Sequence, residues 1–329
     1  MPSNEKKLSF CYDVITRLRN GEQCVNQIYK KNRTALMIAS WFAEDDSSLE
    51  MVKELIKYGA DPNLKDDEGS TALAYAVFDF NEGNSLKVIQ ELVKAGADID
   101  SKNNCGWTAL MYVSCYANDD GSVEIVKELI KAGANINLQD EEGSTALMFA
   151  ASYSNTDSTL ETVQELIKNG ADMNLQDNDG RTALMFACYN SHNLSSLETV
   201  QELIKRRANL NIRNKKGWTA IMHATYISDE AESLDTVKEL IKANAEFEKQ
   251  DMKLLKSSKY GITRKAKMLL LEYLRKREMQ DEKNSVGVVL KCRGIKSEYV
   301  EKRIKKLMKK LEDISSEVEV VITSIYENQ

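Results

Sequence analysis

The sequence predicts an all-α repeat solenoid, followed by a small C-terminal segment of mixed α and β structure. A Thr-Ala-(Leu/Ile) step recurs every 37 residues, at Thr34, Thr71, Thr108, Thr145, Thr182 and Thr219. An amphipathic segment follows each step, most clearly LETVQELIK at 160–168 and again at 197–205. Residues 145–181 and 182–218 agree at 20 of 37 positions. Chance does not produce such recurrence, and a fixed period of this size is typical of stacked repeats.

Each unit is predicted to hold two helices and a turn. The threonine can cap the first helix, and small residues such as Ala146 and Ala150 permit close packing. In the second helix the apolar residues fall on one stripe of a 3.6-residue period. A left-handed glycine is expected to end that helix, at Gly59, Gly96, Gly133 and Gly170. Arg207 and Asn244 take this position in the last two repeats, where a left-handed Arg207 would cost about 1 kcal/mol.

The repeat resembles the ankyrin family over most of the chain. The resemblance rests on DEGSTAL at 67–73, DNDGRTAL at 177–184, and the closing GADPN at 59–63 and GADMN at 170–174. It implies antiparallel helix pairs with hairpin fingers turned out from them, and protein partners that dock on the fingers and inner helices. The 37-residue period exceeds the usual 33, and we place the extra residues between the two helices. The style is similar to that of ankyrin proteins of large DNA viruses and intracellular microbes, which engage host proteins.

Four regions are expected along the chain. Residues 1–30 are predicted to form a capping half repeat, in which Ile15 and Leu18 match Val52 and Leu55. Residues 31–251 hold six full repeats, and residues 252–279 a shorter helix pair that caps the other end. Residues 280–329 break the pattern: β-branched SVGVVLK at 285–291, an amphipathic helix, and EVEVVITSI at 317–325 suggest a small βαβ-like appendage.

The resemblance also places the partner-binding surface on the concave side. The residue before each threonine should face it, as Arg33, Ser70, Trp107, Ser144, Arg181 and Trp218. The exits of the first helices should add a ladder of rings, Trp41, Phe42, Phe78, Tyr116, Tyr153, Tyr189 and Tyr226. Aromatic and arginine side chains commonly supply the strongest contacts in protein interfaces. The alternative is that these rings pack over the inserted residues and contact no ligand.

Charge is unevenly distributed along the chain. Residues 251–329 hold 19 Lys and Arg against 12 Asp and Glu, a net charge of +7, whereas the rest of the chain carries −13. The early fingers and the insertions are acidic, which favours a basic partner segment on the first half of the array. No DxDxDG loop with a closing Glu occurs, so no calcium site or other metal site is expected.

The basic C-terminal appendage has three interpretations. It could fold back on the last repeat as a polar cover, because the terminal repeats of an array need one. Its two strands could pair with those of a second copy, since exposed strand edges extend readily. Its Lys and Arg residues could tether the chain to nucleic acid or an anionic membrane, although interspersed acids dilute the basic face. We therefore expect protein partners and do not expect nucleic acid to be the main one.

Catalysis and cofactors are not expected. The sequence contains no GxxxxGK[ST], GxSxG or HExxH motif. Cys188 and His192 are four residues apart, but packing is the favoured interpretation of a cysteine at a helix exit. The six cysteines form no CxxC pair, which favours a reducing compartment, cytoplasmic or nuclear. Neither a secretory signal nor a membrane-spanning stretch is apparent.

Overall fold

The computed structural model describes residues 4–42, 46–78, 85–116, 120–153, 157–191, 197–225, 231–257 and 264–292. The chain separates into two compact units, Met1–Leu271 and Glu272–Gln329. The inserted residues between paired helices fall largely in the gaps of the described ranges. Residues 293–329 also lie outside them, and with them most of the expected appendage.

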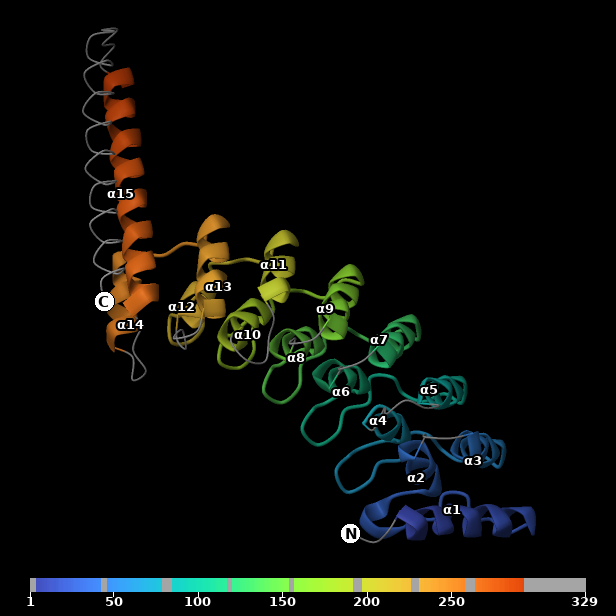
Figure 1. Cartoon of the computed structure of the whole chain (residues 1–329). Coiled ribbons are helices and arrows are strands. Elements are labelled where there is room, and N and C mark those ends of the chain that lie inside the picture. The colour runs from blue at the N-terminus through green and yellow to red at the C-terminus, as the bar shows by residue number, and fades with distance from the viewer. Residues whose placement is uncertain are drawn as a thin grey trace. The chain divides into compact units, whose positions relative to one another are not determined.

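The described part of the repeat array contains helices and no strands, with one isolated antiparallel bridge between Ile28 and Thr34. The first helix of each repeat belongs to one layer: α2 (Ala35–Trp41), α4 (Ala72–Ala76), α6 (Ala109–Tyr116), α8 (Ala146–Ser152), α10 (Ala183–Asn190) and α12 (Ala220–Ala224). The second helices form the other layer: α3 (Asp46–Lys57), α5 (Ser85–Lys94), α7 (Asp120–Lys131), α9 (Asp157–Lys168), α11 (Leu197–Lys205) and α13 (Ala231–Lys242). Each helix packs against its counterpart in the adjacent repeat (Figure 1). The all-α repeat solenoid is therefore confirmed.

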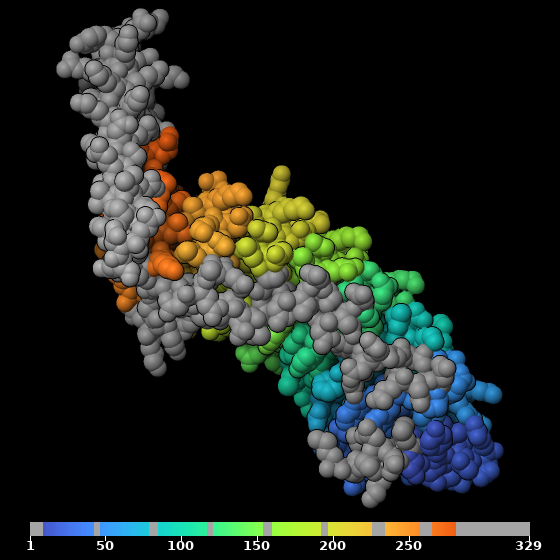
Figure 2. Space-filling model, in the orientation of Figure 1, coloured from blue at the N-terminus to red at the C-terminus, as the bar shows by residue number. Residues whose placement is uncertain are grey.

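The repeats follow one another on the surface in sequence order, as the colour gradient of Figure 2 shows. We number them one to six by their threonines, from Thr34 to Thr219. Within each repeat the core comes from both helices. In repeat four, for example, Leu147 and Ala150 of α8 and Val163 and Leu166 of α9 are fully or almost fully buried. Alternating large and small buried residues let the two layers lie close together.

The threonines cap the first helices as the sequence predicts. The hydroxyl of Thr145 accepts a hydrogen bond from the backbone N–H of Met148 at 3.3 Å. The same bond forms in the other repeats except the sixth, where the buried hydroxyl of Thr219 has no partner among the described residues. In repeat one the sulfur of Met37 also accepts from the backbone N–H of Thr34 at 3.4 Å. Thioether sulfur is a weak acceptor, but here it satisfies one of the free donors at the helix start.

The ends of the second helices adopt the left-handed conformation. Gly59, Gly96, Gly133 and Gly170 have φ between 85° and 96°. Arg207 and Asn244 keep the same backbone with φ of 68° and 61°. The second helix therefore ends in the same backbone conformation in all six repeats, whichever residue occupies the position.

Replacing Arg207 with glycine is expected to stabilise the array by about 1 kcal/mol. Glycine adopts a left-handed conformation without the steric cost that a Cβ atom imposes. The side chain of Arg207 is exposed, so little packing is lost. Urea unfolding followed by circular dichroism would measure the gain. Arg207→Ala is the control: it removes the long side chain but keeps Cβ, and an equal gain in this variant would contradict a backbone origin.

Adjacent repeats are also tied by a ladder of side chains in the closing loops. Oδ1 of Asn63 accepts from the backbone N–H of Asp98 at 2.7 Å, and its Nδ2 donates to the carbonyl of Gly96. The corresponding Oδ1 atom accepts from the next repeat at five more positions, Asn26, Asp100, Asn137, Asn174 and Asn211. Each rung satisfies a loop N–H that would otherwise need water.

Further helices flank the six repeats. At the N-terminal side α1 (Asn4–Arg19) packs against α2 and α3 and buries Ile15 and Leu18; the short η1 (Lys30–Asn32) follows it. After repeat six, α14 (Lys249–Ser257) places the carboxylate of Asp251 against the guanidinium of Arg213 at 2.8 Å.

The last described helix differs from the expectation. Helix α15 runs over Arg264–Cys292, so residues 285–291, expected to form a strand, are helical. Gly287 is the only glycine between Glu278 and Lys291, no proline occurs there, and one glycine costs a helix only about 1 kcal/mol. The other elements of the βαβ-like appendage lie outside the described residues. No helix in the described ranges is long and apolar enough to cross a membrane.

Candidate functional site

The fingers are the polar turns before each first helix, and in repeats two to six one Asp or Asn organises the turn. In repeat four, Oδ1 of Asp140 accepts from the backbone N–H groups of Glu142 and Ser144 at 3.0 and 2.7 Å. The same pair of bonds forms at four equivalent residues, Asp66, Asn103, Asp177 and Asn214. A short side-chain acceptor thus fixes the turn, which is a role that Asp and Asn fill equally well.

Neighbouring fingers are joined through their backbones. The N–H of Asn178 donates to the carbonyl of Glu142 in the preceding finger at 2.9 Å, and every other adjacent pair of fingers forms the corresponding bond. The finger glycine of repeats two to five permits this approach. A Cβ atom on Gly143, whose φ is 77°, would lie 2.7 Å from the backbone nitrogen of Asn178. The loops before α4, α6, α8 and α10 accordingly project in the same direction (Figure 1).

The second polar atom of the finger residue reaches the first helix in three repeats. The hydroxyl of Tyr75 donates to Oδ2 of Asp66 at 2.6 Å, and Nδ2 of Asn103 donates to the hydroxyl of Tyr112 at 2.7 Å. Burial, and next the hydrogen bond to Asp66, raise the pKa of Tyr75, so this phenol remains a donor. These bonds fix the ring of the first helix against the base of its own finger.

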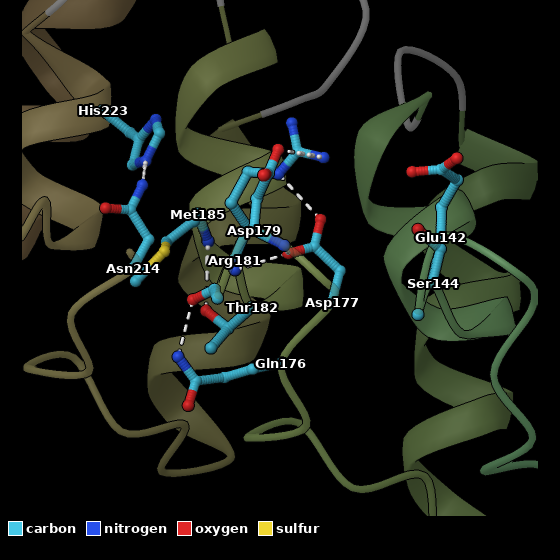
Figure 3. A network of polar contacts seen from close by, with 12 residues as sticks. Glu142, Ser144, Gln176, Asp177, Asp179, Arg181, Thr182, Met185, Asn214 and His223 are labelled. Atoms are coloured by element: carbon cyan, nitrogen blue, oxygen red, sulfur yellow. Dashed lines mark hydrogen bonds and ion pairs between the residues drawn. The ribbon is translucent and has the colours of Figure 1, made fainter. Parts of the chain in front are cut away.

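Repeat five uses an arginine for the same purpose. Its ring is Phe186, which has no polar atom to offer. Nε of Arg181 donates to Oδ2 of Asp177 at 2.7 Å, and its guanidinium carbon lies 4.6 Å from the centre of the Phe186 ring. A second nitrogen of the guanidinium lies 3.5 Å from the carboxylate of Asp179 (Figure 3). The cation is therefore held by two carboxylates and an aromatic face.

The residues before the threonines pack on these rings. Trp107 contacts Tyr112 of its own repeat and Phe149 of the next, with ring centres 5.0 and 4.4 Å apart. The guanidinium of Arg33 lies over Trp41 and Tyr75 at 5.1 and 5.3 Å. Ser70, Ser144 and Trp218 are buried, Trp218 with 9 % of its surface exposed. Trp218 therefore lies beneath the surface, and Trp107 and Arg33 are half-buried within it.

The helix-exit rings are exposed instead. Phe78, Tyr116, Tyr153 and Tyr189 have between 39 % and 52 % of their surface accessible, and they are among the few large apolar residues of the described chain with this exposure. Phe78 also contacts Tyr112 and Tyr116 edge to face, with ring centres 5.9 and 6.3 Å apart. Trp41 is half-buried and Phe42 buried. Tyr226 lies outside the described residues.

The comparison with known families agrees with this architecture. A family profile described as ankyrin repeats, in three copies, matches residues 8–103, 79–159 and 157–251. Together these matches span residues 8–251, well over half of the chain.

The chain belongs to the ankyrin-repeat family.

No curated protein matches the sequence. The family membership confirms the resemblance found in the sequence, and ankyrin repeats generally mediate interactions between proteins.

The thiol of Cys188 lies in the core of this ankyrin array. Cys188 is 1 % exposed, and burial raises the pKa of its thiol. Its proposed partner His192 lies outside the described residues. Within the described ranges, no group of three or more His, Cys, Asp or Glu residues is arranged to hold a metal ion.

The pairing of finger residue and helix ring was missed by reading the sequence. The signal was present in ankyrin repeats two to six, because the finger Asp or Asn lies nine residues before a Tyr, Phe or His. Asn103 pairs with Tyr112 and Asn214 with His223, while Asp177, facing Phe186, pairs with Arg181 instead. This covariation between repeats identifies the contact.

His223 should make the stability of the array depend on pH. Its Nε2 lies 3.1 Å from Nδ2 of Asn214, so the neutral ring accepts that hydrogen bond. Burial, assisted by the charges of Arg181 and Lys216, lowers the pKa of His223 from 6.5 to about 4. Between pH 6.5 and pH 4 the unfolded chain therefore binds a proton that the folded chain excludes, and stability falls as the pH is lowered.

The matched variant for this prediction is His223→Tyr, which recreates the Asn–Tyr pair of repeat three. Trp218 contacts residue 223 as Trp107 contacts Tyr112 in that repeat. One pKa unit corresponds to about 1.4 kcal/mol. Because the ring keeps some contact with water, the wild type is expected to lose on the order of 2 kcal/mol more than the variant from pH 6.5 to pH 4. Urea unfolding at several pH values measures both. Parallel pH profiles for the two proteins would contradict the assignment.

Proposed function

We propose that this ankyrin array is a non-enzymatic scaffold that binds a partner protein on the surface formed by its fingers and first-helix exits. The observation that carries the proposal is the exposure of Phe78, Tyr116, Tyr153 and Tyr189 at the first-helix exits of four successive repeats, seven or eight residues after the threonine. Large rings are normally covered in a soluble protein, and exposed apolar groups in a row mark contact surfaces. We name these four residues the aromatic ladder.

The packing beneath the aromatic ladder supports a binding role. Trp107 and Arg33 bridge rings of adjacent repeats, and Phe78 leans on Tyr112, which is itself tied to Asn103. The exposed rings therefore stand on a layer whose positions are fixed by hydrogen bonds and stacking. A surface that is ordered before binding loses less conformational entropy when a partner docks.

The test is affinity capture with the full chain as bait. Tyr116→Ala/Tyr153→Ala is expected to lose partners that the wild type retains, because buried aromatic contacts in interfaces each contribute at least about 2 kcal/mol. Tyr58→Ala is the matched control: Tyr58 has 38 % of its surface exposed but lies after helix α3, away from the first-helix exits. Equal loss in both variants would show that the aromatic ladder is not the binding surface.

A second bait, ending at Cys292, separates the array from the basic C-terminal residues. Retention of the partner by this bait supports binding on the array. If the partner is lost with the truncation and kept by Tyr116→Ala/Tyr153→Ala, the proposal fails in favour of the C-terminal residues. Binding through them should weaken steeply with added salt if nucleic acid or an anionic membrane is the partner.

We also propose that the protein works in a reducing compartment, cytoplasmic or nuclear. Five cysteines among the described residues are free thiols, Cys11, Cys24, Cys105, Cys115 and Cys188. Cys105 is exposed on a finger, where an oxidising environment would favour its reaction.

A further inference from the structure

Repeat five shows how this array binds a guanidinium group. Arg181 is held by Oδ2 of Asp177 at 2.7 Å and by the carboxylate of Asp179 at 3.5 Å, and it lies 4.6 Å from the centre of Phe186. The arginine comes from the position just before the threonine. We call the two carboxylates and the ring of one repeat its arginine clamp.

Repeat two contains a second example with a different donor. The guanidinium of Arg33, which comes from the finger of repeat one, lies 5.3 Å from the centre of the Tyr75 ring. Its Nε is 3.7 Å from Oδ2 of Asp66. The second carboxylate of this repeat, Glu68, pairs with Lys31 at 2.9 Å. The clamp thus accepts a cation that another segment supplies, and both of its carboxylates are neutralised.

Repeat four has the same three groups without a cation. Asp140, Glu142 and Phe149 each lie 37 residues before Asp177, Asp179 and Phe186. The residue that corresponds to Arg181 is Ser144 (Figure 3). Oδ1 of Asp140 holds the finger turn. Within the described residues, neither Oδ2 of Asp140 nor the carboxylate of Glu142 takes part in any hydrogen bond or ion pair.

The ring of this clamp carries one residue from the preceding finger. Trp107, from the preceding finger, packs on Phe149 as Arg33 packs on Tyr75. In repeat five the clamp arginine comes from the finger of the same repeat. Ser144 is too short to reach the equivalent place on Phe149, so that side of the ring carries no residue from its own finger.

The other fingers lack this combination. In repeat three the two finger positions hold Asn103 and Cys105, and in repeat six Asn214 and Lys216. Repeats two and five have both carboxylates, but each already binds a cation. Among the fingers that the structure describes, repeat four alone pairs two carboxylates and a ring with no cation of the chain.

We propose that the clamp of repeat four binds the side chain of an arginine presented by the partner protein. This inference rests on the proposed function, since the clamp lies between Tyr116 and Tyr153 of the aromatic ladder in sequence order. A guanidinium is planar, so it can stack on Phe149 while its nitrogens face Asp140 and Glu142. A lysine ammonium offers no flat face and no fork of donors, and binds more weakly there.

The test begins with random dodecapeptides displayed on phage and selected on the immobilised full chain. The selected peptides are synthesised, and their affinity is measured by fluorescence polarisation. Peptides that contain arginine are expected to dominate. Replacing that arginine with citrulline, which keeps the shape but removes the charge, should weaken binding on the order of tenfold or more.

Four variants of the chain locate the contact. Asp140→Asn should retain the finger turn, because Asn103 and Asn214 hold the same turn in their repeats. It should weaken the arginine peptides about tenfold, and Glu142→Gln should weaken them less. Ser144→Arg supplies the clamp with its own cation and should abolish their binding. Asp179→Asn is the control and should leave the affinity unchanged, because Arg181 keeps its shorter bond to Asp177.

Two results would overturn the inference. One is that the chain binds the arginine and citrulline forms of the selected peptides with equal affinity. The other is that Asp140→Asn and Ser144→Arg bind the arginine peptides as tightly as the wild type does. If such peptides still lose affinity for Tyr116→Ala/Tyr153→Ala, the proposed function stands and only the arginine site fails. If no selected peptide responds to either set of variants, both proposals fail.

Discussion

Gly143→Ala is expected to lower the free energy of unfolding by roughly 3 kcal/mol or more. At a φ of 77° an alanine is strained by about 1 kcal/mol. In addition, its Cβ atom would lie 2.7 Å from the backbone nitrogen and 2.9 Å from the side-chain oxygen of Asn178. Backbone atoms cannot move aside cheaply, so the two fingers must separate and the hydrogen bond from Asn178 to Glu142 is lost.

Gly217→Ala provides the control for that prediction. Gly217 occupies the same place in the last finger with a φ of 76°, but its Cβ atom would meet only the side chain of Leu254 at 3.5 Å. The cost there should be only the backbone strain, about 1 kcal/mol. Urea unfolding monitored by circular dichroism compares the two variants. Equal losses would mean that contact between fingers contributes little to the stability of the array.

Asp66→Ala is expected to cost about 3 kcal/mol, the second largest effect. The side chain of Asp66 is fully buried and accepts hydrogen bonds from Tyr75, Glu68 and Ser70. It is also the counter-ion of Arg33, whose side chain is only 16 % exposed. Removing one carboxylate therefore leaves three donors unsatisfied and one nearly buried cation unpaired. Each such group retains its full desolvation cost.

The charge can be separated from the hydrogen bonds with Asp66→Asn. Repeat three already contains this arrangement, because Asn103 holds its finger and donates to Tyr112. The amide should keep the turn and lose only the ion pair with Arg33, so Asp66→Asn should cost less than Asp66→Ala. Thermal and urea denaturation of both variants measure the difference. If Asn and Ala at position 66 are equally destabilising, the finger depends on the ion pair and not on the turn.

Much of the fold could be predicted from the sequence because its determinants are local and repeated. The threonine cap and the left-handed closure each involve residues close together in the chain, so their period of 37 residues is visible in the sequence. Even the irregular closures at Arg207 and Asn244 follow from register alone. Helix α15 includes residues 285–291, for which the sequence suggests a strand, because a short apolar run suits a strand and a buried helix segment equally well.

The candidate surface was less predictable because exposure depends on the layer beneath each residue. Trp218 and Phe78 are both aromatic and both were expected to face the partner, yet 9 % of the first and 52 % of the second is accessible. The side chain before the threonine packs on the ring of the first helix, whereas the side chain at the helix exit lies beyond that ring and is exposed. The clamp of repeat four could not be identified from the sequence either. It follows from which carboxylate oxygens of Asp177 and Asp140 form hydrogen bonds, and only the structure gives these.

The ladder of Asn and Asp side chains in the closing loops has a consequence for the evolution of the gene. Each rung joins one repeat to the next with the same donor and acceptor geometry, from Asn26 to Asn211. In-frame duplication or deletion of one whole repeat would therefore create a junction with the same bond as the junctions that it replaces. A recombination event that removes part of a repeat would instead leave a loop N–H without its acceptor. Selection on this ladder alone would preserve the length of the unit while allowing the number of units to change.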